Sequence, residues 1–443
     1  MESIKKLCVV SCPIATRSGY GSRSRDFVRA LLKEKGDEWD IKILSQRWGD
    51  LSMNALTPDD KDLSSRIIPK LEQKPDVWFQ ITIPNEFQPV GHFNVGVSAV
   101  IESSDATADF IEGCNRMDLN IVSSEHSKTT LKAVYDKLND QTKQKLGELK
   151  IEKPVEVLFE GYDTDIYDNK KPISKTVEKT LSEIPEQFCF LFVGHWLQGE
   201  LGEDRKGIST LIHAFLNTFK TSSFNKKSQP ALILKASIGK PCITSVLEIK
   251  KRIEKIKEMD GMSGKLPNIY ILDGDMTDEE MNSLYNHPKV KSHVSFTHGE
   301  GFGRPLLEAC VSGKPIIASG WSGHLDFLHP EYNFLLGGEL KEVHPSARNK
   351  WFQEGSKWFK VNYGQATGTM KTIYDKYKKA LEMSRKNRHY VKTNFTKEHM
   401  ATKLSQILDE YKAGQGPQQV TLKLPKLKKK YWRRITQVDI EVI

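Results

Sequence analysis

Residues 294–313 read VSFTHGEGFGRPLLEACVSG, in which an apolar run, a glycine-rich bend and a helical pattern follow one another. The apolar run 294–297 predicts a buried strand. Pro305 stands where the first helical turn would begin, a favoured place for a residue without a backbone N–H, and Gly313 is a natural helix stop. The stretch therefore predicts a strand, a tight bend and a helix, the unit from which parallel α/β sheets are built.

The bend has the features of an anion site. A loop that opens into a helix N-terminus presents free N–H groups and the positive end of a dipole, which suits a diphosphate. Gly301 and Gly303 lack side chains that would block a close approach. Glu300 follows the strand at the edge where ligands bind in open α/β sheets, and Glu308 lies about one turn inside the helix. Both carboxylates can accept hydrogen bonds from the hydroxyls of a sugar or a ribose; the alternative is a pair of solvated acids.

The same alternation of strand and helix extends along the rest of the chain. Apolar runs predict strands at 7–12, 41–44, 77–83, 93–101, 119–122, 188–193, 231–235, 268–272 and 315–318. Helical patterns lie at 22–34, 208–219, 244–259, 324–328, 369–383 and 398–411, and Thr277 forms a capping box with Glu280. We therefore expect an α/β protein with two doubly wound, Rossmann-like lobes.

The polar stretch 168–183 marks the expected boundary between these lobes. The predicted divisions are a first lobe at 1–167, a second lobe at 184–385, a closing helix at 386–412 and a basic tail at 413–443. Six scattered cysteines without a CxxC pair indicate free thiols in a reducing compartment. The N-terminal residues do not read as a signal peptide, and no stretch approaches the ~18 apolar residues of a membrane span. We therefore expect a cytoplasmic protein that is at most peripheral at a membrane.

The net charge is +9, and the tail carries part of it. Seven basic residues and two acidic ones lie in 413–443, a balance of +5. Such a run can contact an anionic surface, either lipid or nucleic acid. A solvated tail without a partner is the alternative.

The bend and its helix resemble a known enzyme family. Glu300 to Ala309, followed by Gly313-Lys314-Pro315, matches the E-x7-E signature of retaining glycosyltransferases of the family 4 type, in its common form E-G-F-G-x-x-x-x-E-A. The resemblance implies the GT-B fold, in which the two lobes face each other across a cleft. It also implies transfer of a sugar from a nucleoside-diphosphate sugar to an acceptor hydroxyl, with retention of anomeric configuration.

The resemblance assigns roles to the residues of the motif. It places Glu300 on the donor sugar and Glu308 on the ribose of the nucleotide. The backbone of Gly301, Phe302 and Gly303 would contact the sugar and the phosphates. Ser322, in the turn 319–323, would face the donor from the next loop, although an ordinary turn explains that segment equally well.

A second matching segment supplies the expected cations. Residues 192–194 and 205–215 are similar to the first βα unit of the family's donor lobe, where a Lys and an Arg neutralise the leaving diphosphate. Lys206 matches the Lys, but His195 stands at the Arg position, so Arg205 is the alternative second cation. A Lys at a helix start opposes the helix dipole, a placement that a bound diphosphate would explain.

The first lobe offers weaker predictions. Gly19 and Gly21 follow the first strand and match the place where the family's Gly-rich loop approaches the donor phosphate, although a simple turn also fits. Glu102 follows a strand and is expected on the acceptor side. His92 is a second acceptor-side candidate, but a buried structural histidine is the favoured interpretation.

The sequence predicts no metal and no cofactor beyond the nucleotide-sugar donor. The triplets Asp163-Thr164-Asp165 and Asp273-Gly274-Asp275 resemble metal-binding D-x-D motifs, yet their positions favour turns. The acceptor stays unidentified among glycan, lipid, protein and modified nucleic acid. Two alternative functions are a DNA-modifying glycosyltransferase, which would flip out its target base, and an inactive module that binds nucleotide sugar or nucleic acid.

Overall fold

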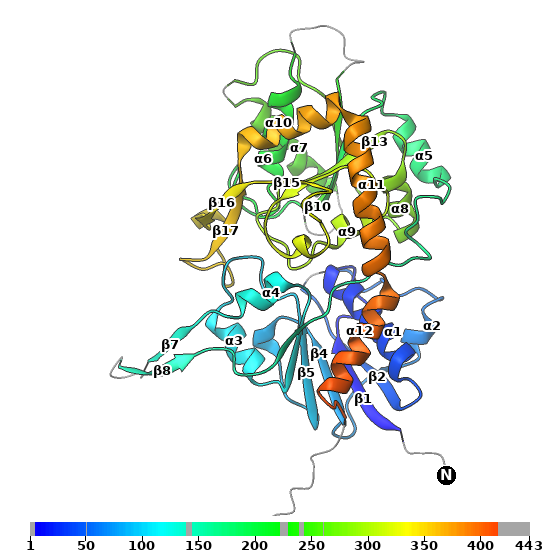
Figure 1. Cartoon of the computed structure of the whole chain (residues 1–443), viewed down its shortest axis with the longest axis vertical. Helices are drawn as coiled ribbons and strands as arrows, with labels where there is room; N and C mark the ends of the chain where they lie inside the picture. The colour runs from blue at the N-terminus through cyan, green and yellow to red at the C-terminus, as the bar shows by residue number, and fades with distance from the viewer. Residues whose placement is uncertain are drawn as a thin grey trace, which may run out of the picture.

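The computed structural model describes residues 5–49, 51–138, 144–221, 229–238, 243–259 and 261–414. The first half of the chain forms a seven-stranded parallel sheet in the order β3-β2-β1-β4-β5-β6-β9. Its strands are β1 (Lys6–Cys12), β2 (Trp39–Ser45), β3 (Ile67–Ile68), β4 (Val77–Ile81), β5 (Phe93–Ser98), β6 (Leu119–Val122) and β9 (Val155–Val157). The helices that belong to this half are α1 (Gly19–Lys35), α2 (Lys61–Ser64), α3 (Ala108–Asn115) and α4 (Glu125–Thr130) (Figure 1).

The second half repeats the arrangement with a six-stranded parallel sheet in the order β12-β11-β10-β13-β14-β15. Its strands are β10 (Cys189–His195), β11 (Ala231–Ser237), β12 (Ile269–Ile271), β13 (Val290–Ser295), β14 (Ile316–Ser319) and β15 (Phe334–Leu336). The helices are α5 (Lys175–Ser182), α6 (Ile208–Phe219), α7 (Ile243–Lys257), α8 (Asp278–Asn286), α9 (Arg304–Cys310) and α10 (Tyr363–Asp375). Each lobe is therefore doubly wound, as predicted.

Apolar residues bury both faces of each sheet. In β10, alternate residues belong to two separate cores: Phe190 and Phe192 pack with α6, while Leu191 packs with α9. β1 divides in the same way, since Val10 faces α1 and Val9 faces the α3 side. Burial on both faces is the reason that these strands are continuous apolar runs in the sequence.

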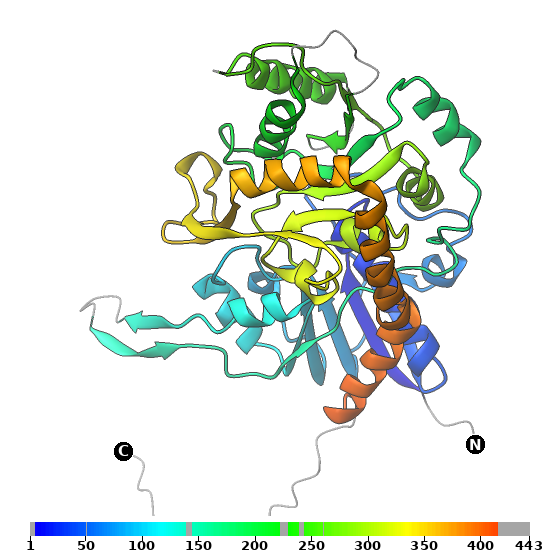
Figure 2. The same cartoon turned by 45° about the horizontal axis from the view of Figure 1, so that its top comes forward.

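The chain returns to the first lobe after completing the second. α11 (Tyr377–Asn394) leads into α12 (Lys397–Glu410), which packs on α1 and places Met400, Leu404 and Leu408 in the first lobe's core. Figure 2 shows α11 on the second lobe continuing into α12 on the first lobe. The predicted division at residue 385 falls inside the continuous helix α11, and of the tail at 413–443 only residues 413 and 414 belong to the described part.

Several elements differ from the predictions. β13 begins at Val290 and ends at Ser295 instead of covering 294–297. The prediction missed its first half because Ser292 and His293 are polar, although both are buried. Residues 323–326 form a short 3₁₀ turn, and 369–383 covers parts of two helices. Two antiparallel hairpins were not predicted: β7 (Tyr135–Leu138) with β8 (Lys145–Leu149), which projects from the first lobe in Figures 1 and 2, and β16 (Gly338–Glu342) with β17 (Lys357–Val361).

Five of the six cysteines are buried free thiols, and the sixth, Cys242, lies outside the described residues. Among the helices in the described ranges, none has the length and apolar character needed to cross a bilayer.

Candidate active site

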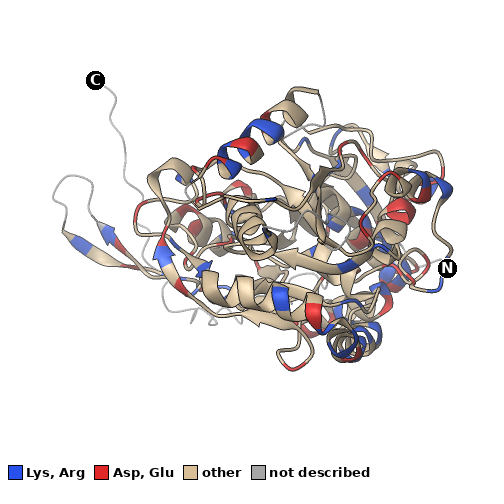
Figure 3. Cartoon of the chain, turned by 90° about the horizontal axis from the view of Figure 1, so that it is seen from above, with Lys and Arg blue, Asp and Glu red and all other residues tan. Residues whose placement is uncertain are grey.

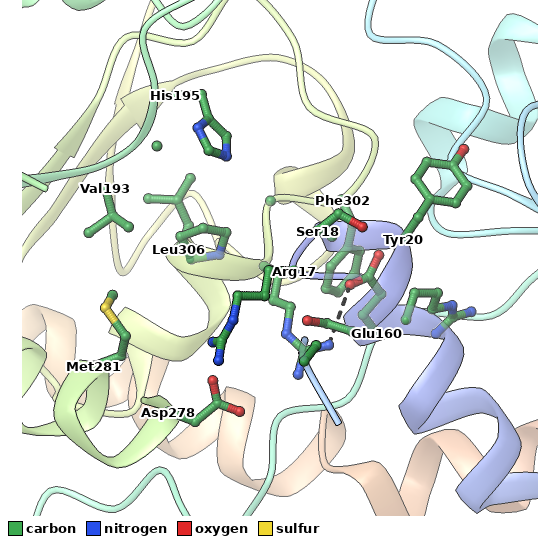
Figure 4. A pocket seen from close by; sticks show the side chains of 18 of the residues that line it. Arg17, Ser18, Tyr20, Glu160, Val193, His195, Asp278, Met281, Phe302 and Leu306 are labelled. Carbon is green, nitrogen blue, oxygen red and sulfur yellow. Dashed lines mark ion pairs between the residues drawn. The ribbon is translucent and has the colours of Figure 1, made fainter. Parts of the chain in front are cut away.

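A cavity of about 1100 Å³ lies where the carboxyl ends of the two sheets meet, and residues of both lobes line it. Figure 4 shows Arg17, Ser18 and Tyr20 of the first lobe opposite His195 and Leu306 of the second. This is the edge at which open α/β sheets bind ligands. The predicted site residues that line it are Gly19, Glu102, His195, Arg205, Lys206, Glu300, Gly301, Phe302 and Gly303.

The glycine-rich loop is held from two sides. Phe302 is buried against Phe327, with ring centroids 5.1 Å apart. Gly303 has a φ of 96°, which favours glycine, and a Cβ on it would lie 3.0 Å from the Cβ of His324. The carbonyl of Gly301 accepts hydrogen bonds from three serine hydroxyls of the first lobe: Ser123, Ser124 and Ser127. The loop is thereby fixed against the opposite lobe.

Lys206 and Glu300 form a charged pair within the cavity. The Nζ atom of Lys206 lies 2.5 Å from Oε1 of Glu300, and the two side chains are 16% and 13% exposed. Burial would raise the pKa of Glu300, but Lys206 and Arg205 outweigh it and hold the pKa below its ordinary value. Burial lowers the pKa of Lys206, which Glu300 partly opposes. The site thus holds an ionised carboxylate beside a partly desolvated ammonium.

Arg205 lies beside this pair and reaches the other lobe. Its Nη1 atom donates to the carbonyl of Gly299 at 3.0 Å and lies 3.2 Å from Oε1 of Glu102. Glu102 follows β5, so this ion pair crosses the cleft. Glu102 and Arg205 therefore both line the cavity and meet across it, while their predicted roles toward the acceptor and the diphosphate stay predictions.

The loop before α6 explains how Lys206 is placed. Gly207 is the N-cap in the left-handed region, with φ of 63°. The carboxylate of Asp204 accepts the backbone N–H groups of Ile208 at 2.8 Å and Ser209 at 3.1 Å. Asp204 therefore satisfies the start of α6, while Lys206 extends into the cavity.

His195 and Ser322 have different positions around the pair. His195 ends β10 and lines the cavity, with Nδ1 3.0 Å from Oγ of Ser237. Burial, followed by the charge of Lys206, lowers its pKa, so His195 supplies a neutral imidazole where the resemblance predicts a cation. Ser322 is buried, and its Oγ accepts the backbone N–H of Glu300 at 2.9 Å. Ser322 is not part of the cavity lining and instead supports the backbone of Glu300.

Glu308 lies beneath the cavity surface and is not among its lining residues. Its Oε1 accepts from Nε of Arg304 at 2.9 Å, and its Oε2 accepts from the Tyr285 hydroxyl at 3.4 Å. Burial raises the pKa of Glu308 to about 7, although Arg304 acts in the opposite direction. The predicted ribose ligand is thus already engaged by protein groups.

The first-lobe predictions separate in the structure. Gly19 lines the cavity, but the N–H of Gly21 donates to Oγ of Ser18 at 2.9 Å, and a Cβ on Gly21 would lie 2.2 Å from the Thr16 carbonyl. Gly21 therefore serves packing. His92 is exposed just before β5, about 20 Å from that strand's carboxyl end. Its predicted burial is wrong, and its position does not support an acceptor contact.

The two D-x-D triplets also differ. Asp163 accepts the backbone N–H of Asp165 at 2.9 Å and pairs with Lys397 at 2.8 Å, which is turn and ion-pair chemistry. Asp275 lines the cavity and lies 3.8 Å from Arg17 of the first lobe. Within the described part of the chain, no group of three or more His, Cys, Asp or Glu side chains is arranged to hold a metal ion.

Sequence reasoning missed several lining residues. Arg304 occupies a variable position within the motif, so its spacing gave no signal. Trp48 stacks on Tyr20, with ring centroids 4.1 Å apart, on the first-lobe wall. Lys235, near the end of β11, also lines the cavity, and its Nζ donates to the carbonyl of Gly274 at 2.5 Å. A basic residue at the end of the apolar run 231–234 was the available signal for Lys235.

No protein-family model and no curated protein sequence matches the chain. Solved structures do match it. A glycosyltransferase from Rickettsia africae has a TM-score of 0.59 at 16% identity, covering 92% of this chain and 98% of its own. Sucrose-phosphate synthase from Thermosynechococcus elongatus has a TM-score of 0.59 at 12% identity, covering 93% and 100%.

Anabaena HepE in complex with UDP-glucose has a TM-score of 0.57 at 13% identity, covering 91% of this chain and all of its own. Identities this low establish a common fold. The chain therefore has the GT-B fold of these glycosyltransferases, two Rossmann-like lobes that face each other across a cleft.

Proposed function

We propose that this protein is a glycosyltransferase that moves a sugar from a nucleoside-diphosphate sugar to an acceptor hydroxyl. The observation that carries the proposal is the buried pair of Lys206 and Glu300 in a cavity between two Rossmann-like lobes. A fixed cation in a desolvated site stabilises the charge of a departing diphosphate. A fixed carboxylate can accept hydroxyl groups of the donor sugar. HepE, of similar fold, is known in complex with UDP-glucose, which makes uracil the first base to test.

The proposed reaction proceeds with retention of configuration, as the E-x7-E motif favours. The bond between the anomeric carbon and the phosphate oxygen breaks, and a bond from that carbon to the acceptor oxygen forms. The acceptor's proton passes to the departing phosphate oxygen, so the protein need not supply a covalent nucleophile. Lys206 and Arg205 meet the growing negative charge, while Glu300 orients the sugar. We further propose that no metal is required, since these two cations replace it.

The proposal divides the chain by task. The second lobe, 184–385, would hold the donor through Lys206 and Glu300, and the first lobe, 1–167, would present the acceptor beside Glu102. The helical segment 386–412 would tie the lobes together. Free buried thiols favour a reducing, cytoplasmic setting. Lys and Arg are interspersed with Asp and Glu in the view from above (Figure 3), which gives no support to a polyanionic acceptor on that face.

Donor hydrolysis tests the proposal. UDP-glucose, GDP-mannose and ADP-glucose are incubated with the protein without acceptor, and release of nucleoside diphosphate is followed. A glycosyltransferase releases the diphosphate slowly from its own donor, because water replaces the acceptor. Lys206→Ala serves as the matched control for contaminating hydrolases. Binding of a nucleotide sugar without any release above that control would instead indicate an inactive binding module.

A further inference from the structure

Arg304 connects the two lobes through a buried guanidinium. It is the first residue of α9, and its Nε lies 2.9 Å from Oε1 of Glu308 on the same helix. Its Nη1 lies 2.5 Å from Oδ2 of Asp26, which belongs to α1 of the first lobe. The exposed fractions of the three side chains are 15%, 10% and 5%. One cation is therefore shared between two carboxylates on opposite sides of the cleft.

The first-lobe end of this bridge is held in its ionised form by two neighbouring cations. Burial would raise the pKa of Asp26, but Arg304 and Lys397 reverse this effect and bring it to about 2. Nζ of Lys397, at the start of α12, lies 2.7 Å from Asp26 and 2.8 Å from Asp163. Glu160, labelled in Figure 4, lies 4.0 Å from Arg304. The chain's two crossings between lobes thus meet at this cluster.

The second-lobe end of the bridge titrates near neutrality. Glu308 is surrounded by Arg304 of its own helix, by Tyr285 and Asp278 of α8, and by Tyr167 of the crossing segment. Burial and Asp278 raise its pKa, and Arg304 is the opposing cation. If the Arg304 guanidinium pairs more closely with Asp26 or with Glu308, the charge of Glu308 at neutral pH therefore changes.

We infer that Arg304 is a positioning residue that couples the ionisation of Glu308, and so its hold on a nucleotide ribose, to the approach of Asp26 on the opposite lobe. This inference rests on the proposed function, because it needs a nucleotide that contacts Glu308. Separation of the lobes withdraws Asp26 and leaves the guanidinium to Glu308. Approach of the lobes shares the guanidinium, and Glu308 becomes easier to protonate. Nucleotide binding and lobe closure are thereby linked through one side chain.

The coupling predicts opposite effects for two substitutions. Arg304→Gln removes the cation, so the pKa of Glu308 rises and the pH midpoint for nucleotide binding moves upward. Asp26→Asn removes the competing anion, so Arg304 serves Glu308 fully and the midpoint moves downward. A role limited to structural support would weaken binding or stability in both variants without shifting the midpoints in opposite directions.

The experiment measures the affinity of full-length protein for UDP, GDP and ADP from pH 5 to pH 9, using whichever binds the wild type most tightly. We expect an upward shift of at least half a pH unit for Arg304→Gln and a downward shift for Asp26→Asn. Arg304→Lys keeps the charge and is expected to restore most of the wild-type midpoint. Glu308→Gln should abolish this change of nucleotide affinity with pH. The variant thereby distinguishes titration of Glu308 from titration of the nucleotide's own phosphate.

The outcomes distinguish this inference from the function on which it rests. If the wild type binds none of the three nucleotides, the proposed function fails. If it binds one of them but the two midpoints stay in place or move together, the coupling through Arg304 is overturned while the function stands. Circular dichroism checks that each variant folds. If one variant does not fold, the direction in which the other variant's pH midpoint moves decides whether the coupling through Arg304 stands.

Discussion

Lys206 and Glu300 approach within 2.5 Å, and burial disfavours the charged form of either side chain alone. We expect Lys206→Ala to lower kcat for donor hydrolysis about 10²- to 10³-fold and to change donor affinity much less, because charge on the leaving group is largest in the transition state. Steady-state release of nucleoside diphosphate gives both constants. Lys206→Arg, which keeps the charge, is the matched control. Equal losses in rate and affinity would make Lys206 a ground-state ligand only.

Glu308 is expected to bind the ribose once it is ionised. Its pKa is raised to about 7, mainly by burial, so nucleotide affinity should fall as the pH is lowered through that value. At pH 8, Glu308→Ala should weaken nucleoside diphosphate binding roughly 10- to 150-fold, since a hydrogen bond to a charged group is worth about 1.5–3 kcal/mol. Isothermal titration measures the change. Unchanged affinity would place the ribose elsewhere.

Removal of divalent metals tests the charge assignment as a whole. Donor hydrolysis should survive excess EDTA, because Lys206 and Arg205 are proposed to meet the charge of the diphosphate. The same assay with added manganese or magnesium is the control. Complete loss in EDTA with rescue by either metal would move attention to Asp275, the D-x-D residue that lines the cavity.

The sequence was a better guide to which second-lobe residues lie together than to the contacts that they make with the first lobe. Lys206 and Glu300 are 94 positions apart, yet each follows a strand of the same sheet, so their meeting at one edge was foreseeable. The pairing of Arg304 with Asp26 depends on how two separate sheets are placed, which local patterns do not encode. Ser322 lies in the expected turn, but its side chain is directed to the backbone of Glu300.

At the scale of elements, a contact between two segments sets the position of Lys206. Gly207, just before α6, packs against the backbone of Phe296, just after β13. Gly207 is left-handed, and a Cβ there would lie 2.2 Å from the carbonyl oxygen of Phe296. Gly355 is also left-handed, with φ of 83°, but it has open space around it. Gly355→Ala should cost about 1–2 kcal/mol of stability from the backbone alone. Gly207→Ala should cost more, because the Phe296 backbone must also move.

Urea unfolding followed by circular dichroism measures both glycine variants. Gly207→Ala should additionally lose donor hydrolysis, since Lys206 is its neighbour, whereas Gly355→Ala should keep it. Equal losses of stability would show that crowding against Phe296 has no energetic weight. Retained hydrolysis in folded Gly207→Ala would separate this contact from the placement of Lys206.

Element prediction succeeded where apolar runs are buried on both faces, as in β6, whose bounds were foreseen in full, and in α6. Prediction failed where strand residues are buried but polar, and where strand residues are exposed. β13 buries Ser292 and His293, so Val290 at its start is not part of a continuous apolar run. The hairpin of β7 and β8 fails for the opposite reason, since its side chains are mostly exposed and no face of it alternates clearly.

At the scale of the whole molecule, α12 makes the first lobe depend on the far end of the described chain. Met400, Leu404 and Leu408 are buried against α1, and Lys397 pairs with Asp26. The backbone of Tyr162 bonds to Phe395 and Lys397, so the outgoing and returning crossings run side by side. The residues that line the cavity lie between Arg17 and Lys397.

Two truncations test this dependence. Deleting residues 417–443 removes the predicted basic tail, which lies outside the described residues, and should leave folding and donor hydrolysis intact because α12 ends at Glu410. Deleting 396–443 also removes α12 and should abolish cooperative unfolding of the first lobe, because burying each large apolar side chain contributes about 1.5–3 kcal/mol. Thermal melts and the hydrolysis assay compare both with the full chain.

The shorter truncation also tests the tail's expected contact with an anionic surface. If seven basic residues bind lipid or nucleic acid, the full chain should bind anionic liposomes or DNA with a strong salt dependence, and the 417–443 deletion should not. Equal binding by both proteins would assign that contact to the folded lobes. Loss of donor hydrolysis on deleting 417–443 would instead show that the tail supports the fold, and the surface contact would then be abandoned.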